Sequence, residues 1–182
     1  MSMRHSASTI LFLALSTATA GAQGDSTISS HGLGGIHLCQ PLSVVGDRFP
    51  SARDTIIESE GARWPAKVVP LSGGRRILFE ASWIDASHVW RIATNSPRYR
   101  TARGYHVGMT LGNLRDKREQ IRFGYAEGVI VITLVADQVD FLPDDSTARA
   151  FLARSPRAFD SLEALPSTAR IQDLGVSGDC RH

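Results

Sequence analysis

Few side chains in this sequence are spaced in a way that would support catalysis or metal binding. A hydrolase nucleophile of the Gly-x-Ser-x-Gly type is absent. The neighbouring acids Asp144 and Asp145 point in different directions, so they most simply end a strand and cap a helix. Three histidines and a cysteine could gather around a metal, but zinc sites usually show ligand pairs such as Cys-x-x-Cys. These four residues are His31, His37, Cys39 and His106. The sequence therefore predicts no catalytic residue, no cofactor-binding residue, no cofactor and no metal ligand.

One segment has a composition suited to binding a partner. Residues 97–103 contain three arginines and a tyrosine. Guanidinium groups bind the acidic groups of proteins, phosphorylated glycans or lipid headgroups through paired N–H donors. We therefore take four residues of this segment as partner-binding candidates: Arg98, Tyr99, Arg100 and Arg103. The other interpretation, which we favour over binding, is a solvated linker between the two repeat units, with Tyr99 inserted into the core.

The tryptophans offer a second kind of surface. Trp64, Trp83 and Trp90 lie in one stretch of predicted strands, where such residues more often belong to the core. They would indicate a binding platform only if two of them lay exposed side by side.

The first 22 residues have the composition of a signal peptide. Arg4 and His5 give a basic start, residues 10–15 form an apolar run, and Ala20-Gly21-Ala22 is a small-x-small cleavage site. The apolar run is too short to span a bilayer, and no later segment approaches that length. We therefore predict cleavage after Ala22, an exported protein in the periplasm or outside the cell, and no transmembrane segment.

The charge of the exported chain argues against nucleic acid as a partner. Removing Arg4 from the 20 Lys and Arg residues leaves 19, against 18 Asp and Glu residues. A near-neutral chain lacks the basic excess that phosphate backbones attract. Another envelope or secreted protein is the partner class that stays open, and the oligomeric state is not predicted.

Export also bears on the two cysteines, Cys39 and Cys180, which we predict to form a disulfide. The bond would tie the start of the domain to its end. A structural bond is favoured over a redox site because the cysteines are far apart and no Cys-x-x-Cys is present.

The stretch 101–115 predicts how the chain is organised. It reads as a short strand, a turn at Gly108, and a helix that begins after the capping residue Thr110. A weaker copy lies at 35–42. Residues 23–34, rich in Ser, Gly and Thr, predict a flexible lead-in. The remaining 35–182 would then be a single domain, with 35–96 and 101–145 as the optional repeat units and 146–182 as a helical tail.

Antiparallel strands are expected in both units. Apolar and β-branched runs predict strands at 63–71, 75–83 and 88–93 in the first unit, and at 119–125, 129–136 and 139–142 in the second. The segment 53–61 reads as a loop or a strand. Helices are expected at 42–49, 147–154 and, as a single turn, 159–165.

The segment Arg103 to Leu114, with Gly-Met-Thr followed by Leu-x-x-Leu, resembles two families of exported proteins. One is the small outer-membrane-assembly lipoproteins of the SmpA type, and the other is the β-lactamase-inhibitor proteins, in which two units stand in tandem. The resemblance also extends to uncharacterised exported bacterial proteins. It implies an α+β fold and protein–protein binding, and it supplies no catalytic residue.

These observations lead to one combined expectation. The fold would be α+β, an antiparallel sheet with short helices packed on one face, in one or two strand–helix–meander units. The function would be that of a non-enzymatic exported binding or envelope-associated domain, acting through protein–protein contact. The alternative is a small secreted or periplasmic enzyme with an unrecognised active site. A sheet face with exposed aromatic residues and an arginine rim would favour the binder, and a cleft with convergent ionisable groups the enzyme.

Overall fold

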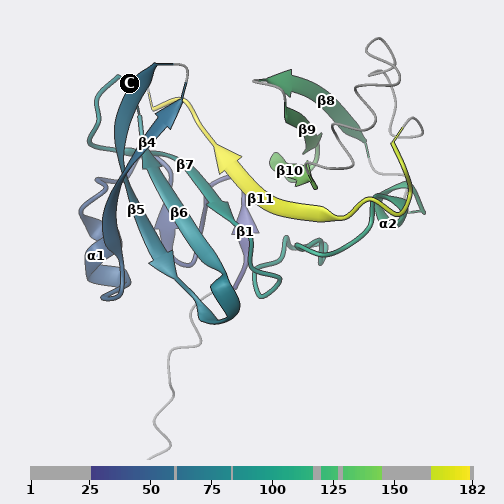
Figure 1. Cartoon of the computed structure of the whole chain (residues 1–182), viewed down its shortest axis with the longest axis horizontal. Coiled ribbons are helices and arrows are strands. Elements are labelled where there is room, and N and C mark those ends of the chain that lie inside the picture. Colours follow the sequence, from purple (N-terminus) through teal and green to yellow (C-terminus); the bar gives the residue numbers. More distant parts are fainter. Residues whose placement is uncertain are drawn as a thin grey trace, which may run out of the picture.

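Eight strands form one antiparallel sheet in the order β4-β5-β6-β7-β11-β10-β9-β8 (Figure 1). The computed structural model describes residues 26–59, 61–82, 84–116, 120–126, 129–144 and 165–180. The strands are β4 (Arg53–Ser59), β5 (Ala62–Pro70), β6 (Arg76–Ala81), β7 (Val89–Thr94), β8 (Ile121–Ala126), β9 (Val129–Leu134), β10 (Val139–Pro143) and β11 (Ile171–Ser177). Each of the two groups β4–β7 and β8–β10 is a meander of consecutive strands.

Strand β11 joins the two meanders. Its first half pairs with β10, from Ile171 opposite Pro143 to Gly175 opposite Asp140. Its second half pairs with β7, from Leu174 opposite Thr94 to Ser177 opposite Arg91. Figure 1 shows β11 as a long twisted strand between the two groups. The last strand of the chain is therefore at the centre of the sheet.

One face of the sheet packs against a second layer of short elements. This layer contains a three-stranded sheet of β1 (Ile28–Ser29), β2 (Gly32–Leu33) and β3 (Ile36–His37), followed by helix α1 (Val44–Arg48). In Figure 1, β1 and α1 lie behind the strands β4–β7. Alternate residues of the large sheet, such as Phe79, Ile92 and Leu174, are buried in one apolar cluster with Ile28 and Val45 of the second layer. Successive side chains of a strand point to opposite faces of the sheet, so every second residue of these strands faces the core.

Helix α2 (Leu111–Asp116) lies near the start of β11. Leu111 and Leu114 are fully buried on one side of it. Gly108, at φ +91°, makes the turn before the helix, as the sequence predicts. Asn113 Oδ1 accepts hydrogen bonds from the backbone N–H and the hydroxyl of Thr110. Thr110 therefore precedes the helix as expected, although its hydroxyl bonds a side chain instead of a backbone N–H.

The predicted α+β class is wrong. The protein is mostly β, and its described residues contain only two α-helices, of five and six residues, beside an eight-stranded and a three-stranded antiparallel sheet. The first helix is short because Pro50 follows it closely and ends it. A β-strand, β11, also occupies part of the tail 146–182 that was expected to be helical. The predicted helix 147–154 and most of the turn 159–165 lie outside the described residues.

Other expectations about the elements are confirmed. The strands predicted at 63–71, 75–83 and 88–93 correspond to β5, β6 and β7, and 53–61, left open, contains β4. Part of the predicted flexible lead-in differs, because Ile28 and Leu33 are buried in β1 and β2. The order of short helix then antiparallel meander does occur twice, while a duplication of the sequence stays a prediction.

The predicted disulfide is present. Cys39, after β3, is bonded to Cys180, after β11, with their Cα atoms 5.3 Å apart. It links the second layer to the central strand of the sheet. Within the described part of the chain, no helix is long and apolar enough to cross a membrane.

Candidate functional site

The face of the large sheet opposite the core is hollowed at its centre. Across the strands β6, β7 and β11, Leu78 lies opposite Ala93, and Ala93 lies opposite Gly175. Ala93 has only a methyl group as its side chain and Gly175 has none, so few side-chain atoms cover the sheet at this point. A Cβ added at Gly175 would make ordinary van der Waals contact with the carbonyl oxygen of Ile92, at 3.4 Å, so the glycine leaves unfilled space on this face. The small residues therefore leave room above the sheet.

The space above these residues is part of a groove of about 700 Å³. It crosses six neighbouring strands, from β4 at the edge to β10 beyond β11. Its lining residues are Ile57, Glu58, Ser59, Ala62, Trp64, Arg76, Leu78, Glu80, Trp90, Arg91, Ala93, Leu142 and Asp173. A volume of this size lies within the range of ligand-binding sites in proteins.

A buried carboxylate organises the floor of the groove. Glu80, on β6, is only 1% exposed. Its Oε2 accepts a hydrogen bond of 3.2 Å from Trp64 Nε1, and its Oε1 accepts one of 3.1 Å from Arg91 Nη1. Trp64 is on β5 and Arg91 on β7, so the three side chains span three adjacent strands. Burying a charge is costly unless it is paired and hydrogen-bonded, and Glu80 meets both conditions.

A second tryptophan lines the same groove. Trp90 lies in the irregular stretch of β7 where the pairing with β6 shifts register. Its indole Nε1 is buried and has no hydrogen-bond partner among the residues that the structure describes. Trp90 also lines a smaller cavity of about 350 Å³ beside the disulfide. Two of the three tryptophans, each half-buried, therefore contribute to one groove, and Trp83 lies outside the described residues.

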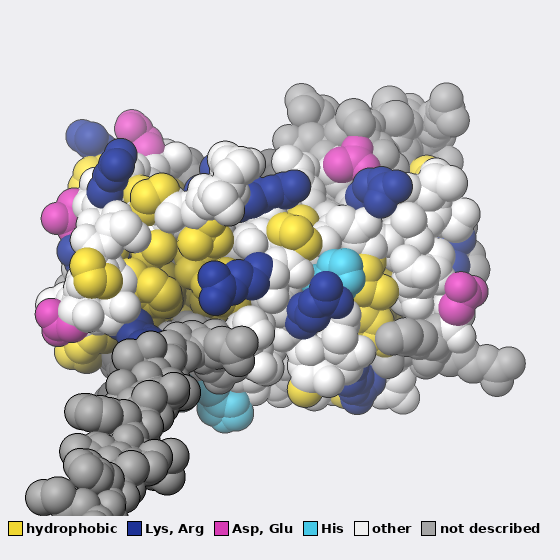
Figure 2. All heavy atoms as spheres, turned by 90° about the horizontal axis from the view of Figure 1, so that it is seen from below, with side chains coloured by type: hydrophobic (Ala, Val, Ile, Leu, Met, Phe, Trp, Pro, Cys, Tyr) yellow, Lys and Arg dark blue, Asp and Glu magenta, His cyan; other side chains and the backbone are white. Residues whose placement is uncertain are grey.

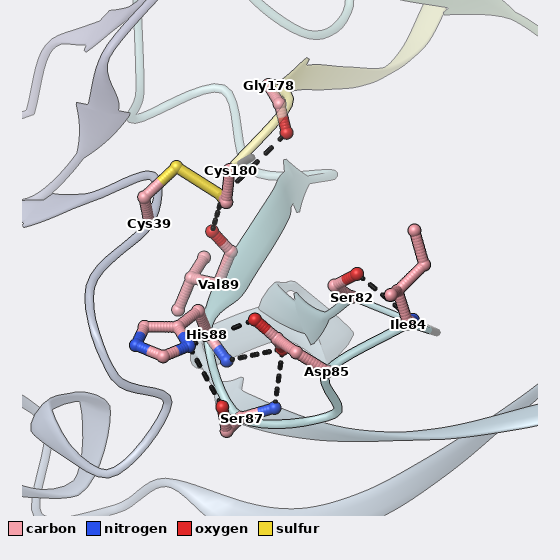
Figure 3. Close-up of polar contacts among 9 residues, drawn as sticks. All are labelled: Cys39, Ser82, Ile84, Asp85, Ser87, His88, Val89, Gly178 and Cys180. Carbon is pink, nitrogen blue, oxygen red and sulfur yellow. Dashed lines mark hydrogen bonds and ion pairs between the residues drawn. A yellow bond between two sulfur atoms is a disulfide. The ribbon is translucent and has the colours of Figure 1, made fainter. Parts of the chain in front are cut away.

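The loop between β6 and β7 contains a serine, a histidine and an aspartate in contact (Figure 3). Asp85 Oδ2 lies 3.0 Å from His88 Nδ1, and Ser87 Oγ lies 2.9 Å from the same nitrogen. A catalytic triad needs the serine and the acid on opposite nitrogens of the ring. The cluster therefore lacks the geometry of a nucleophilic site.

Asp85 instead holds the turn. Its Oδ1 accepts hydrogen bonds from the backbone N–H of Ser87 at 2.8 Å and of His88 at 3.1 Å. These two bonds, followed by the contact with the His88 ring, lower the pKa of Asp85 from its usual 3.8. The turn lies close to the disulfide, as Figure 3 shows.

The structure separates the four partner-binding candidates. Arg98 and Arg100 are exposed, whereas Tyr99 is only 5% exposed. Burial raises the pKa of Tyr99, partly offset by the nearby charges of Arg98 and Arg48. Arg103 lies 3.6 Å from Asp137 in an ion pair. None of the four lines the groove.

The connection from β7 to α2, which contains these residues, runs along the lower side of the molecule in Figure 1. Figure 2 shows that side, where Lys and Arg side chains lie across the surface while Asp and Glu lie mainly at its margins. An apolar patch lies beside the basic side chains.

The histidines and cysteine weighed as a metal site are not brought together. Cys39 is used in the disulfide, and His37 is exposed on the second layer. His106 Nδ1 lies 2.8 Å from the carbonyl oxygen of Val107. Among the described residues, no three His, Cys, Asp or Glu side chains are grouped in a way that could hold a metal ion.

Sequence reasoning did not identify Glu80 or Arg91. The single available signal is that a glutamate interrupts the apolar run Ile77-Leu78-Phe79 and that an arginine lies between Trp90 and Ile92. Charged residues on the alternate phase of strands usually face solvent, and only the strand pairing shows that these two meet.

No protein-family model matches the chain, and no curated protein matches it. Among solved structures, the chain is similar to the uncharacterized protein yfeY from Escherichia coli, known from a crystal structure. The TM-score is 0.60 at 11% sequence identity, over 84% of this chain and 99% of that chain. At this identity the similarity shows the fold alone. The resemblance to assembly lipoproteins and β-lactamase inhibitors stays a prediction.

Proposed function

We propose that this protein is an exported binding domain that acts through contact with another envelope or secreted protein. A segment of that protein would occupy the groove on the open face of the sheet. The observation that carries the proposal is the lining of this groove. Trp64, Trp90 and Leu142 supply apolar surface, and the Glu80–Arg91 pair supplies fixed polar groups among them. Aromatic and arginine side chains of this kind are the residues that dominate binding energy at protein interfaces.

The hydrogen bonds of Glu80 favour a positioning role for this residue over acid–base chemistry. A general acid or base needs a proton-exchanging atom within reach of a substrate. Both carboxylate oxygens of Glu80 are already hydrogen-bonded, and the residue is almost fully buried. Its role is therefore to position Trp64 and Arg91, which are the groups that face the groove.

Export is supported by two independent features. The Cys39–Cys180 disulfide is typical of oxidising compartments. The first 22 residues, which lie outside the described part of the chain, have the pattern of a signal peptide. A periplasmic or extracellular location is part of the proposal.

The arginine segment is the second contact surface in this proposal. Arg98 and Arg100 are exposed, so they are available to acidic groups of the same partner. Tyr99 contributes by packing the segment against the core rather than by touching the partner. Arg103 is engaged with Asp137 and fixes the end of the segment.

Strand β4 provides a matched pair of positions for the test. Ile57 lines the groove, whereas its neighbour Ile56 is 52% exposed on the other face of the same strand. We would place the photocrosslinker p-benzoylphenylalanine at either position in the full chain, in its own envelope, and identify the adducts by mass spectrometry. A defined protein adduct is expected from position 57 and not from position 56.

The partner identified in this way is then purified and titrated with three variants. Ile57→Glu is expected to weaken binding by about tenfold or more, because it places a charge among apolar contacts. Ile56→Glu should leave the affinity unchanged. The triple variant Arg98→Glu/Arg100→Glu/Arg103→Glu tests whether the arginine segment also contacts the partner. Equal effects of Ile56→Glu and Ile57→Glu, or no adduct at position 57, would contradict the proposed site.

A further inference from the structure

The guanidinium group of Arg91 faces the groove with most of its hydrogen-bonding capacity unused. A guanidinium has five N–H donors. One of them, on Nη1, is bonded to Glu80, and no other partner of Arg91 is found among the described residues. The side chain is 36% exposed and belongs to the lining of the groove. The remaining donors are therefore available to a bound molecule.

The hydrogen bond to Glu80 restrains this guanidinium before anything binds. Glu80 is held on its other oxygen by Trp64, so the carboxylate cannot rotate away from Arg91 without losing both bonds. A donor group that is already in place loses less conformational freedom on binding than a free arginine. Trp64, Trp90 and Leu78 around it also lower the local dielectric, which strengthens a charge–charge contact.

The geometry of the groove favours an extended protein segment. Six strands at about 4.8 Å spacing give the groove a length of about 24 Å along the sheet. An extended chain covers about 3.3 Å per residue, so about seven residues span it. The rim residues Ala62 and Arg76 are exposed, so the groove is open to solvent at the rim. A lipid chain would remain partly in water there, whereas a peptide has polar groups that tolerate it.

We propose that the occupant is a protein segment that presents an Asp or Glu side chain to Arg91, with large apolar residues beside it for Trp64 and Trp90. This inference rests on the proposed function and adds the chemistry that the partner must have. A carboxylate matches the unused donors of the guanidinium in charge and, when bidentate, in shape. Arg91 is thus the residue that determines specificity, and Glu80 positions it.

The test uses random heptapeptides displayed on phage and panned against the full exported chain. Each enriched peptide that contains an acid is synthesised in two versions, one with Glu and one with Gln at that position. The wild-type protein should bind the Glu version about tenfold more tightly, as expected for a charge-assisted hydrogen bond in a partly dry site. The indole N–H signal of Trp64 should shift with both versions, which places the peptide in the groove.

A variant that removes the charges of both Glu80 and Arg91 tests whether Arg91 causes the preference for Glu. Glu80→Gln/Arg91→Gln removes both charges, and the amide oxygen at position 80 can still accept the hydrogen bond from Trp64 Nε1, so the fold is expected to remain. In this variant the Glu and Gln peptides should bind with equal affinity. Arg53→Gln is the control, because Arg53 is an exposed arginine on β4, a strand that the groove crosses, and is not part of the groove lining. It should keep the tenfold preference.

Each alternative result is informative. Peptides that shift Trp64 but bind wild type equally in their Glu and Gln versions would overturn the acidic partner and leave the groove as a protein-binding site. Failure of the library to yield any peptide that shifts Trp64 would overturn the inference and the proposed function together. Binding of sodium oleate at Trp64, with no peptide binding, would assign the groove to a lipid instead.

Discussion

At the scale of single residues, the identity of the contacted atom decides what a polar cluster can do. The serine, histidine and aspartate of the β6–β7 loop all meet at one ring nitrogen of His88. The same three residue types would be catalytic only if the ring were used on both sides. Here Asp85 Oδ1 accepts hydrogen bonds from two backbone N–H groups, so the cluster stabilises the turn.

The stabilisation of this turn by Asp85 should depend on pH. Because the folded-state pKa of Asp85 is lowered, its contribution to stability is present above its usual pKa of 3.8 and is lost as the pH falls through the folded value. In Asp85→Asn the amide oxygen can accept the same bonds but does not titrate. The urea midpoint of this variant should therefore fall less steeply between pH 4 and pH 2 than that of the wild type.

Asp47→Asn is the matched control for this measurement. Asp47 is an exposed acid on α1 with no hydrogen-bond partner among the described residues. Its variant should follow the wild-type curve at acid pH. Parallel curves for Asp85→Asn and wild type would mean that the turn does not depend on the charge of Asp85.

Residue-level prediction from the sequence succeeds where chemistry alone fixes the pairing. Cys39 and Cys180 are the only two cysteines of the sequence, so only one intramolecular pairing is possible. Glu80 and Arg91 pair because β6 and β7 are in a register that places them opposite each other. Nothing in the local sequence around either residue reports that register. The groove could therefore not be predicted, although Trp64 and Trp90 were noted as candidates.

At the scale of elements, β11 is the strand on which the large sheet depends. Leu174, fully buried in it, lies opposite Thr94 on one side and Phe141 on the other. It is therefore at the overlap where both meanders pair with the same strand. The sequence did not indicate this strand, because Gln172 and Asp173 interrupt the alternation of apolar residues and Gly175 has a low strand propensity. Tertiary pairing on both sides overrides these local preferences.

Leu174→Ala should consequently be among the more damaging core substitutions. Removing the buried isobutyl group leaves a cavity at the junction, and the free energy of unfolding should fall by about 3 kcal/mol. Gln172→Ala changes an exposed side chain of the same strand, and it should change stability by less than about 0.5 kcal/mol. Urea unfolding followed by tryptophan fluorescence measures both. Equal losses in the two variants would contradict the assignment of β11 as a buried central strand.

At the scale of the whole molecule, the disulfide connects the two layers of the fold. Cys39 follows the small sheet and Cys180 follows β11, at a sequence separation of 141. The backbone N–H of Cys39 also donates a 2.7 Å hydrogen bond to the carbonyl oxygen of Val89 on β7. The crosslink therefore joins the second layer to the middle of the large sheet (Figure 3). Cys180 and Trp90 both line the smaller cavity. A loop of this length gives a crosslink a large effect on the unfolded chain.

Loss of the crosslink should lower the free energy of unfolding by about 5 kcal/mol in Cys39→Ala/Cys180→Ala, the value that the chain-entropy description gives for such a loop. Dithiothreitol should destabilise the wild type similarly and leave this variant unaffected. Cys39 has φ +66°, which suits glycine better than alanine. Cys39→Gly/Cys180→Ala should therefore be more stable than the double-alanine variant by about 1 kcal/mol, which separates backbone strain from chain entropy. A wild type whose urea midpoint does not respond to dithiothreitol would show that the bond does not constrain the unfolded chain as its 141-residue separation requires.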